Sequence, residues 1–498
     1  MKILLVDPCK NASNVNRSRG VTRFPQISLR YISACTPPSH EVEIVEEEVR
    51  PIDFDADCDL VGITCMTANA PRAYVVADEF RRRGKRVVLG GVHPTVRPEE
   101  AARHADAVVV GEAEPVWAGL LGDAEEGRMR NTYRSNTDWS LDDYPLPSRT
   151  PDCARSMAEQ PGQEDAMRQA ERRPLMDALL RPALDGVLWP TLDAIQRAAQ
   201  GVKQWPILEA LSRPAFGVVP VVTSRGCPYA CEFCCVRNMF GRAIRHVSVP
   251  RVMEDIERSG SRRVMFLDDN IVGDQNYAER LFDALRGRGI QWVGQASISF
   301  VRNERLLEKA AASGCRGLFI GLESVVERKV ERMQKGMKTL EATAAAIRRI
   351  TRAGILFHAS IVFGFDDDDP SVFDATLEFL AATRIASATF NILTPYPGTV
   401  LFDQYKSEGR LLSEDWKDFD HCTPTFIPRH MSLEQLIEGY QRVRETFYGL
   451  GSIALRMPAN WRTPLLFSLA NLGLRASIRG DRAVRSVPGL ALSSARSA

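Results

Sequence analysis

The sequence predicts an α/β protein with a Rossmann-like domain, a partial (βα)6 barrel of the TIM type and a helical extension at the carboxyl end. Three observations lead to this prediction. Short apolar runs alternate with amphipathic segments up to about residue 125, the alternation resumes at residue 216 through six further units, and the pattern from residue 431 is helical and then rich in Arg. At 498 residues the chain is also too long for one ordinary core.

The composition excludes several classes of protein. Hydrophobic residues make up 44% and charged residues 26%, as in soluble globular proteins. A net charge of +1 gives no general attraction to nucleic acid, so no nucleic-acid partner is expected. The opening "MKILLVDPCKNAS" is typical of a buried strand and not of a signal peptide, and no long apolar run predicts a membrane span. Eleven cysteines without an export signal indicate a reducing compartment, and we expect a cytoplasmic protein.

Residues 1–135 are expected to form the first domain. A helix at 70–84 has apolar residues at helical spacing and ends on Gly, and the buried parallel strands are predicted at 2–7, 60–66, 86–91 and 107–112. Ligands of such sheets bind beyond the carboxyl ends of the strands, where this chain has loops rich in Gly, Thr and Asn. No GxGxxG occurs, which disfavours a nicotinamide or flavin dinucleotide.

Two regions outside the regular alternation have less readable patterns. Residues 136–212 are expected to be a linker and a helical insertion, with short helices in 174–200 that prolines interrupt. Residues 431–498 are expected to be a helical, Arg-rich extension. Within it, 461–480 is apolar in one half and flanked by Arg, which leaves open a helix packed on the barrel and a peripheral contact with a membrane or a lipophilic substrate.

Residues 213–430 are expected to form the barrel. Helices are predicted at 249–259, 276–288, 303–313, 339–353 and 371–383, between strands that begin near 217, 263, 290, 316, 355 and 386. Barrels of this kind collect their active site at the carboxyl ends of the strands. A cluster of cysteines follows the first strand, at the place where chemistry is expected.

Cys227, Cys231 and Cys234 are spaced C-x3-C-x2-C, and Cys235 follows at once. Structural zinc requires four ligands, and no second C-x2-C is present. Cys231 and Cys234 could formally form a C-x2-C redox pair, but the motif lies in a predicted barrel and not in a thioredoxin-like setting. Three thiolates on one loop could hold three irons of a [4Fe–4S] cluster and leave the fourth iron open to a ligand from outside the protein. We favour this interpretation because it explains the missing fourth cysteine.

The motif "CPYACEFC" after the first strand of a barrel resembles the radical S-adenosylmethionine (SAM) superfamily over residues 216–430. The resemblance implies that the open iron binds SAM and that electron transfer releases a 5′-deoxyadenosyl radical. It also implies SAM contacts from the aromatic Phe233, from Asp268 or Asp269 in "FLDDN", and from Glu323 in "GLES". Ser297, with Gln295 before it, ends the third strand at the same mouth. Each polar residue could instead cap the following helix.

The segment 60–117 resembles the cobalamin-binding domain of B12-dependent radical SAM enzymes, most visibly in "GG-x-HPT" and "GE-x-E". The resemblance implies cofactor contacts from the strand-end loops, at Thr67, Gly90, Gly91, His93 and Gly111. The DxHxxG motif by which other B12 proteins supply a cobalt ligand is absent. His93 could ligate cobalt, but a structural role in its loop is favoured.

Together the resemblances imply a cobalamin-dependent radical SAM enzyme that methylates an unactivated carbon of a small or lipophilic metabolite. Its cofactors would be a [4Fe–4S] cluster, SAM and cobalamin, and its electron donor a flavodoxin or ferredoxin. An oxidative cyclase or a rearrangement enzyme without methyl transfer is the alternative. A domain that has lost cobalamin, an iron–sulfur sensor and a tRNA methylthiotransferase are further hypotheses, the last disfavoured because extra N-terminal cluster cysteines are absent.

Overall fold

The structure is a computed structural model. It describes residues 1–10, 26–136, 138–149, 218–241, 243–326, 339–457, 467–468, 471–476 and 478. The helices predicted in 174–200 and most of the Arg-rich segment after 457 lie outside the described residues.

The first domain contains a six-stranded parallel sheet in the order β2-β1-β3-β4-β5-β6. The four predicted strands are present, as β1 (Lys2–Asp7), β3 (Leu60–Thr64), β4 (Arg86–Gly90) and β5 (Ala107–Val110). Two edge strands that the sequence analysis did not predict complete the sheet, β2 (Glu41–Glu46) and β6 (Thr132–Arg134). β2 has the sequence "EVEIVE", in which Glu alternates with apolar residues as a half-exposed edge strand allows.

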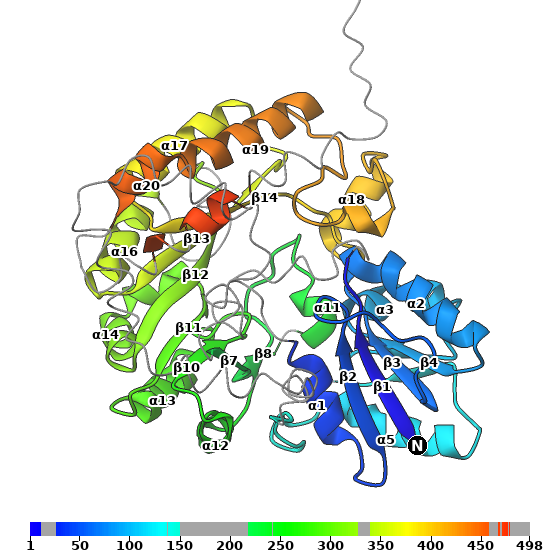
Figure 1. Cartoon of the computed structure of the whole chain (residues 1–498). Coiled ribbons are helices and arrows are strands. Elements are labelled where there is room, and N and C mark those ends of the chain that lie inside the picture. The colour runs from blue at the N-terminus through cyan, green and yellow to red at the C-terminus, as the bar shows by residue number, and fades with distance from the viewer. Residues whose placement is uncertain are drawn as a thin grey trace, which may run out of the picture.

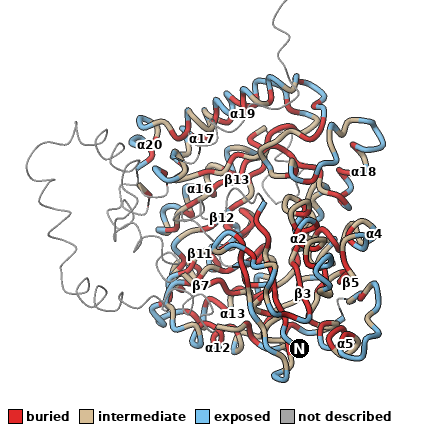
Figure 2. The backbone as a smooth tube through the Cα atoms, turned by 45° about the vertical axis from the view of Figure 1, so that its right-hand side comes forward, coloured by how far each residue is buried: buried red, intermediate tan, exposed pale blue. Residues whose placement is uncertain are grey.

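Helices cover both faces of this sheet (Figures 1 and 2). On one face, α1 (Ser28–Cys35) and α5 (Glu114–Glu125) pack on Ile3, Leu5 and Val88. On the other face, α2 (Ala70–Arg82) packs on Leu4, Val6 and Ile63. Because neighbouring residues of a strand point to opposite faces, an apolar run such as "ILLV" builds both layers. The short elements η2 (Thr67–Asn69), α3 (Val92–Val96) and α4 (Pro98–Ala101) follow the strands.

The second sheet is also parallel and runs in chain order from β7 to β14. It consists of β7 (Val218–Val221), β10 (Arg263–Phe266), β11 (Gln291–Ala296), β12 (Cys315–Glu323), β13 (Leu356–Phe363) and β14 (Ser387–Ile392). The connections are α12 (Val249–Ser259), α13 (Gln275–Leu285), η4 (Ile298–Arg302) with α14 (Glu304–Ala312), α16 (Leu340–Arg352) and α17 (Ser371–Thr383). These helices lie outside the curved sheet, on the side away from the first domain, which confirms a partial (βα)6 barrel (Figure 1).

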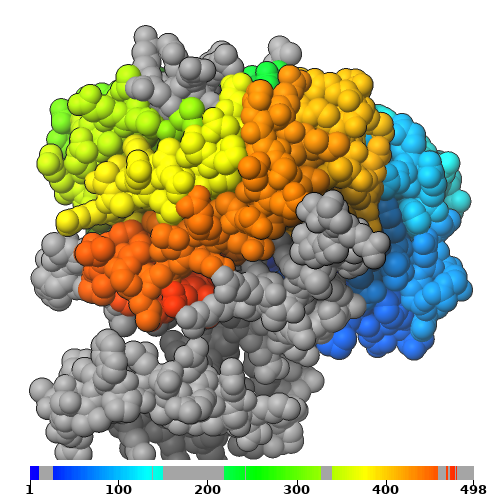
Figure 3. Space-filling view, turned by 90° about the horizontal axis from the view of Figure 1, so that it is seen from above, coloured from blue at the N-terminus to red at the C-terminus, as the bar shows by residue number. Residues whose placement is uncertain are grey.

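The chain after the barrel returns to the first domain. α18 (Val400–Ser407) supplies Phe402, η5 (Trp416–Asp418) supplies Trp416, and the next residue supplies Phe419 to the core beneath α2. The indole Nε1 of Trp416 donates to Glu100 Oε1 at 2.7 Å, and the amber segment near residue 400 abuts the blue domain in Figure 3. The helices α19 (Leu433–Phe447) and α20 (Leu450–Arg456) then pack on the barrel. Among the described residues, no helix has the length and apolarity needed to cross a membrane.

Candidate functional site

The cysteines lie on a loop that a short antiparallel pair closes at its base. β8 (Ser224–Arg225) pairs with β9 (Arg245–His246), and the loop between them carries Cys227, Cys231 and Cys234 beyond the carboxyl end of β7. Gly226 enters the loop with φ +98°, and a Cβ there would lie 2.5 Å from the carbonyl oxygen of Ala243. Any other residue would therefore be strained at the position before Cys227.

The three thiols are partly buried and offer only sulfur ligands. Burial raises the pKa of the Cys234 thiol to about 12, against the backbone N–H of Val236, which lowers it. A thiolate there therefore needs a strong positive partner, as bound iron would be. In the described part of the chain no three His, Cys, Asp or Glu groups converge on one ion position. A [4Fe–4S] cluster does not require convergence, because each thiolate binds its own iron, and the donor set fits this group. Cys235 is the N-cap residue of α11 (Val236–Phe240).

Phe233 packs against the loop that follows β13. Its ring lies edge-on to Phe365, with ring centroids 5.8 Å apart. The loop around Phe365 is fixed from behind, because Asp368 Oδ2 accepts from the backbone N–H of Gly364 at 2.8 Å and of Phe365 at 2.9 Å. The sequence "GFDDDDP" had given no indication of this role.

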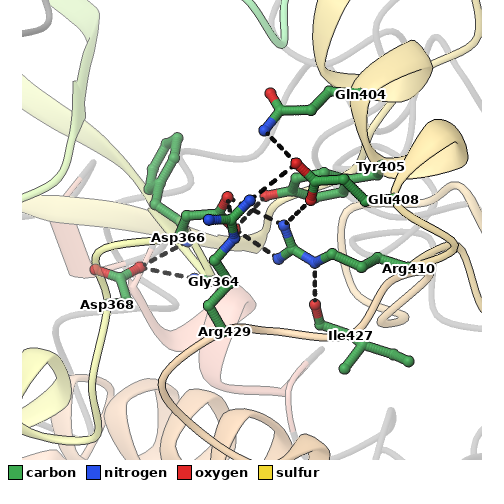
Figure 4. Close-up of polar contacts among 10 residues, drawn as sticks. Gly364, Asp366, Asp368, Gln404, Tyr405, Glu408, Arg410, Ile427 and Arg429 are labelled. Carbon is green, nitrogen blue, oxygen red and sulfur yellow. Dashed lines mark hydrogen bonds and ion pairs between the residues drawn. The ribbon is translucent and has the colours of Figure 1, made fainter.

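A network of ion pairs and hydrogen bonds also holds the loop that follows β13 (Figure 4). Asp366 accepts hydrogen bonds from Tyr405 at 3.0 Å and from both Nη atoms of Arg410 at 3.0 and 2.5 Å, and Arg429 Nε lies 3.0 Å from the same carboxylate. Glu408 accepts from Arg410 and Arg429, each at 2.9 Å. The network therefore ties the loop after β13 to α18 and to the segment that follows it.

Asp268 and Asp269 follow β10 but have different surroundings. Asp268 is 1% exposed, and its carboxylate accepts from the backbone N–H of Thr223 and Ser224, each at 2.7 Å, and from Thr223 Oγ1 at 2.6 Å. It braces the chain between β7 and β8. Asp269 accepts from the Gly226 N–H at 3.2 Å, beside Cys227, and lines a cavity between the domains. Burial raises the pKa of Asp269, while Gly226 and Arg225 lower it.

Ser297 belongs to a hydroxyl cluster between β11 and the cysteine loop. Its backbone N–H donates to Asn270 Oδ1 at 3.0 Å, and its Oγ lies 3.2 Å from Ser299 Oγ. Tyr229, inside the cysteine motif, has its hydroxyl 2.9 Å from Ser299 Oγ. Tyr229, Ser299 and Asn270 were not among the residues predicted from the sequence. Each is an ordinary polar residue, and only the fold shows that they meet.

Glu323 ends β12 in the left-handed region, with φ 61°, and is 8% exposed. A bulge in the pairing with β13 precedes it. Such a conformation is rare for Glu and is concentrated at functional sites. His421 has a similar φ of 63°, and its Nε2 lies 3.0 Å from the Tyr396 hydroxyl. Burial lowers the pKa of His421, and the charges of Asp420 and Glu323 oppose this change, so the imidazole lies within the field of Glu323.

A cavity of about 470 Å³ separates the two sheets. Gly90, Gly91 and Gly111 line it from the first domain, and Asp269 lines it from the barrel. Its floor includes the apolar side chains of Leu5, Ile32, Val88, Val109 and Trp117. Gly91 and Gly111 have φ of +105° and +90°, which other residues rarely adopt. Because glycine has no side chain, the backbone at this rim of the cavity is accessible. An apolar floor beside accessible backbone groups fits a broad, flat cofactor such as a corrin, within the usual size of ligand pockets.

The structure places Thr67 and His93 outside the lining of this cavity. His93 is 0% exposed, with Nδ1 3.3 Å from Thr67 Oγ1 and Nε2 3.5 Å from Glu100. Its ring lies edge-on to Trp416 at 5.1 Å between centroids. The physical reason is local: "GGVHPT" forms the short helix α3, which turns the imidazole into the core. A structural role for His93 in its loop, expected from the sequence, therefore stays a prediction.

Comparisons with known proteins agree with this architecture. The family of B12 binding domains matches residues 17–121, and the Radical SAM superfamily matches residues 221–380. The bacteriochlorophyllide d C-8(2)-methyltransferase of Chlorobaculum tepidum is 30% identical over 409 residues, which cover 79% of each chain. The C-12(1)-methyltransferase of the same organism is 27% identical over 472 residues, which cover 92% of this chain and 91% of that protein.

A solved structure shares the fold over almost the whole chain. The radical SAM methyltransferase TsrM from Kitasatospora setae, with cobalamin and a [4Fe–4S] cluster bound, has a TM-score of 0.60 and 16% identity. The match covers 97% of this chain and 99% of that one. A B12-binding domain before a radical SAM barrel implies a [4Fe–4S] cluster, SAM and cobalamin as the cofactors. The chain belongs to the radical SAM enzymes that carry an N-terminal B12-binding domain.

Proposed function

We propose that this enzyme transfers a methyl group to a carbon atom of a small or lipophilic substrate. The observation that carries the proposal is the shared cavity, which has the glycine loops of the B12-binding domain on one side and Asp269, beside the cysteine loop, on the other. The two relatives from Chlorobaculum tepidum are carbon methyltransferases by name and align with most of the chain, which supports methylation over cyclisation.

The cofactors would divide the chemistry, since the cluster and SAM supply a carbon radical and cobalamin supplies a methyl group. Cys227, Cys231 and Cys234 would hold the irons. Phe233, Asp269, Ser297 and Glu323 would contact SAM at the fourth iron, with Asp269 next to the cysteine loop through its bond with the Gly226 N–H. Asp268 would instead hold the chain before the loop through its bond with the Thr223 N–H. Gly90, Gly91 and Gly111 would admit the corrin. A flavodoxin- or ferredoxin-type protein would supply the electron.

The substrate would lie on the inner face of the barrel. One row of paired residues crosses four strands there: Gln295, Phe319, His358 and Ser387. Their neighbours Leu318, Ile320, Phe357 and Ala359 point the other way, into the core beneath the helices. Phe319 is 37% exposed and stacks on His358 with centroids 5.0 Å apart. An exposed aromatic ring on the inner face of a barrel is suited to packing against a flat substrate.

His358 adds neutral hydrogen-bonding groups to this row of residues. Its Nδ1 lies 2.8 Å from Ser387 Oγ and its Nε2 lies 2.5 Å from Thr389 Oγ1. Burial lowers the pKa of His358 to about 4, so the ring is neutral near pH 7 and one nitrogen donates while the other accepts. The hydroxyl that accepts from the ring keeps its own hydrogen for another partner. We infer that this row receives a neutral part of the substrate that carries a hydrogen-bond acceptor.

The decisive experiment is anaerobic reconstitution with a cluster, SAM, cobalamin and a reductant, with bacteriochlorophyllide d and a panel of other metabolites as substrates. Mass spectrometry should show a product heavier by one methylene unit. A product that has lost hydrogen or gained oxygen would instead identify a cyclase or oxidase. Cys231→Ala should abolish turnover, and a protein that binds no corrin under any condition would contradict the proposal.

The proposed contact of the substrate with this row of residues can be tested in the same assay. Phe319→Ala should raise the KM for the accepted substrate about tenfold or more, because a buried aromatic contact is lost. SAM cleavage without substrate should be unchanged. If the KM stays the same, the substrate does not lie on this row.

A further inference from the structure

Two arginines at the base of the cysteine loop are held by two carboxylates of the B12-binding domain. Arg225 and Arg245 are direct partners in the β8–β9 pair, so they mark the point where the loop begins and ends. Arg225 Nη1 donates to Glu112 Oε1 and Nη2 donates to Glu114 Oε1, each at 2.5 Å. Arg245 Nη2 donates to the second oxygen of Glu112. Glu112 thus bridges both sides of the loop base.

This four-residue group, which we name the loop clasp, is shielded from water. The side chains of Glu112 and Glu114 are 1% and 7% exposed, and those of both arginines are 13% exposed. Burial alone would lower the pKa of Arg225, but Glu114 and Glu112 raise it above its ordinary value. Trp139 lies against both guanidinium groups, 5.7 Å from Arg225 and 4.9 Å from Arg245. Two positive and two negative charges balance, as a buried ionic group requires.

The loop clasp joins the two places that the cofactors would occupy. Glu112 and Glu114 belong to the "GE-x-E" loop, and they line the interdomain cavity together with Gly111 and Arg225. Arg225 lies two residues before Cys227. The same side chains therefore touch the corrin cavity and set the direction in which the cysteine loop leaves the barrel.

We propose that Glu112, Glu114, Arg225 and Arg245 are positioning residues that fix the iron–sulfur cluster and its SAM relative to the corrin. Methyl transfer from SAM to cobalamin would require the two cofactors to be held close together, and small misplacements are costly in such steps. Reductive cleavage of SAM would take place between the cluster and SAM within the barrel, so we expect it to depend less on the position of the corrin. The inference rests on the cofactor positions of the proposed function and not on the identity of the substrate.

Two other contacts between the domains lie elsewhere and serve as a comparison. Trp416 bonds Glu100 at 2.7 Å, and Lys10 bonds Asp420 at 2.6 Å, both away from the base of the cysteine loop. Glu100→Gln is therefore a matched control, because it changes a carboxylate at the domain contact and leaves the loop clasp intact. Glu112→Gln keeps the shape of its side chain and removes the charge that bridges both arginines.

The first measurement uses the protein without cofactors. Hydrogen exchange of the amides in 226–244 should become at least about fivefold faster in Glu112→Gln than in the wild type, and should be unchanged in Glu100→Gln. Equal exchange in the wild type and Glu112→Gln would show that the carboxylate does not hold the loop, and would overturn the proposal.

The second measurement uses the protein loaded with cluster, SAM and reduced cobalamin, without any substrate. S-adenosylhomocysteine reports methyl transfer from SAM, and 5′-deoxyadenosine reports its reductive cleavage. In Glu112→Gln the first should fall about tenfold relative to the second, at unchanged iron content. Arg225→Lys, which keeps the charge but not the forked geometry, should show the same change in ratio.

An unchanged product ratio in both variants would contradict the loop clasp as a positioning device. The same would follow if Glu100→Gln altered the ratio as strongly, since the effect would then belong to domain contact in general. Because no substrate is present, failure of the proposed carbon methylation would leave both readouts intact and would be recognised separately.

Discussion

Asp366 and Arg410 form a paired ion bridge behind the loop that presses Phe365 against Phe233, with Nη1–Oδ2 at 3.0 Å and Nη2–Oδ1 at 2.5 Å. The bridge connects a residue beyond the fifth barrel strand with the segment after α18. Support for the cysteine loop therefore comes from residues almost 200 positions further along the chain, which the network in Figure 4 brings together.

Asp366→Asn should lower the free energy of unfolding by about 1–3 kcal/mol, because Arg410 and Arg429 lose a shared acceptor in a partly buried site. The Kd for SAM should rise severalfold as Phe365 loosens against Phe233. Urea unfolding and calorimetric titration with SAM check the two effects. Asp374→Asn, which breaks an exposed pair with Arg442, is the control and should change neither. An unchanged Kd for SAM in Asp366→Asn would show that this network does not support the SAM site.

Cys234→Ala should reduce the iron and sulfide bound after anaerobic reconstitution, because a cluster with three protein ligands would keep only two. Cys235→Ala should retain both, since Cys235 lies at the N-cap position of α11 without a side-chain capping bond and is not part of the spaced triplet. Iron assay and the electron paramagnetic resonance signal of the reduced cluster provide the measurement. Loss of the cluster in Cys235→Ala, but not in Cys234→Ala, would show that Cys235 and not Cys234 is the third ligand.

His93→Ala should lower the free energy of unfolding by roughly 2–5 kcal/mol, as truncation of a fully buried ring does. The visible spectrum of bound cobalamin should not change, because the ring faces Trp416 and Thr67 in the core. Gly91→Ala is the contrasting variant. Its Cβ would lie 2.8 Å from the Cys65 carbonyl oxygen in a strained conformation at the cavity, and corrin binding should fall. A spectral change in His93→Ala would place His93 on the cobalt.

We expect the protein to lose stability in mild acid because His358 is buried in its neutral form. Burial lowers its pKa from 6.5 to about 4, so the unfolded chain takes up the proton first. The contribution of His358 is fully present above pH 6.5 and is lost as the pH falls toward 4, by on the order of 3 kcal/mol. Urea unfolding between pH 4 and pH 7 should show a shallower pH dependence in His358→Gln. Identical slopes for the two proteins would mean that the ring is protonated freely in the fold.

Much of the architecture could be predicted from local patterns. The strands of both sheets are short apolar runs, and the helices between them have apolar residues at helical spacing, so each element depends on residues close in sequence. β2 and β6 were missed because edge strands are polar on one side or very short. The cysteine triplet was recognisable because its spacing lies within one loop.

Neighbouring residues can have different surroundings, and this limits prediction of the site. Asp268 and Asp269 looked interchangeable in sequence, yet one holds the chain before the cysteine loop and the other lines the cavity. In the loop after β10 the two carboxylates meet different partners, the N–H groups of Thr223 and Ser224 for Asp268 and that of Gly226 for Asp269. His93 likewise followed a strand in a glycine-rich loop, and only the helix α3 decided that its ring enters the core.

The two α/β halves, their order and the loop that carries the three cysteines could be predicted from periodicity and spacing over a few residues. The bonds of Glu112 and Glu114 with Arg225, and the packing of Trp416 beneath α2, depend instead on how the folded chain brings distant segments together. Such contacts join residues more than 100 positions apart, and charge or ring chemistry alone does not select among the many possible partners. The fold selects them by burying these groups together.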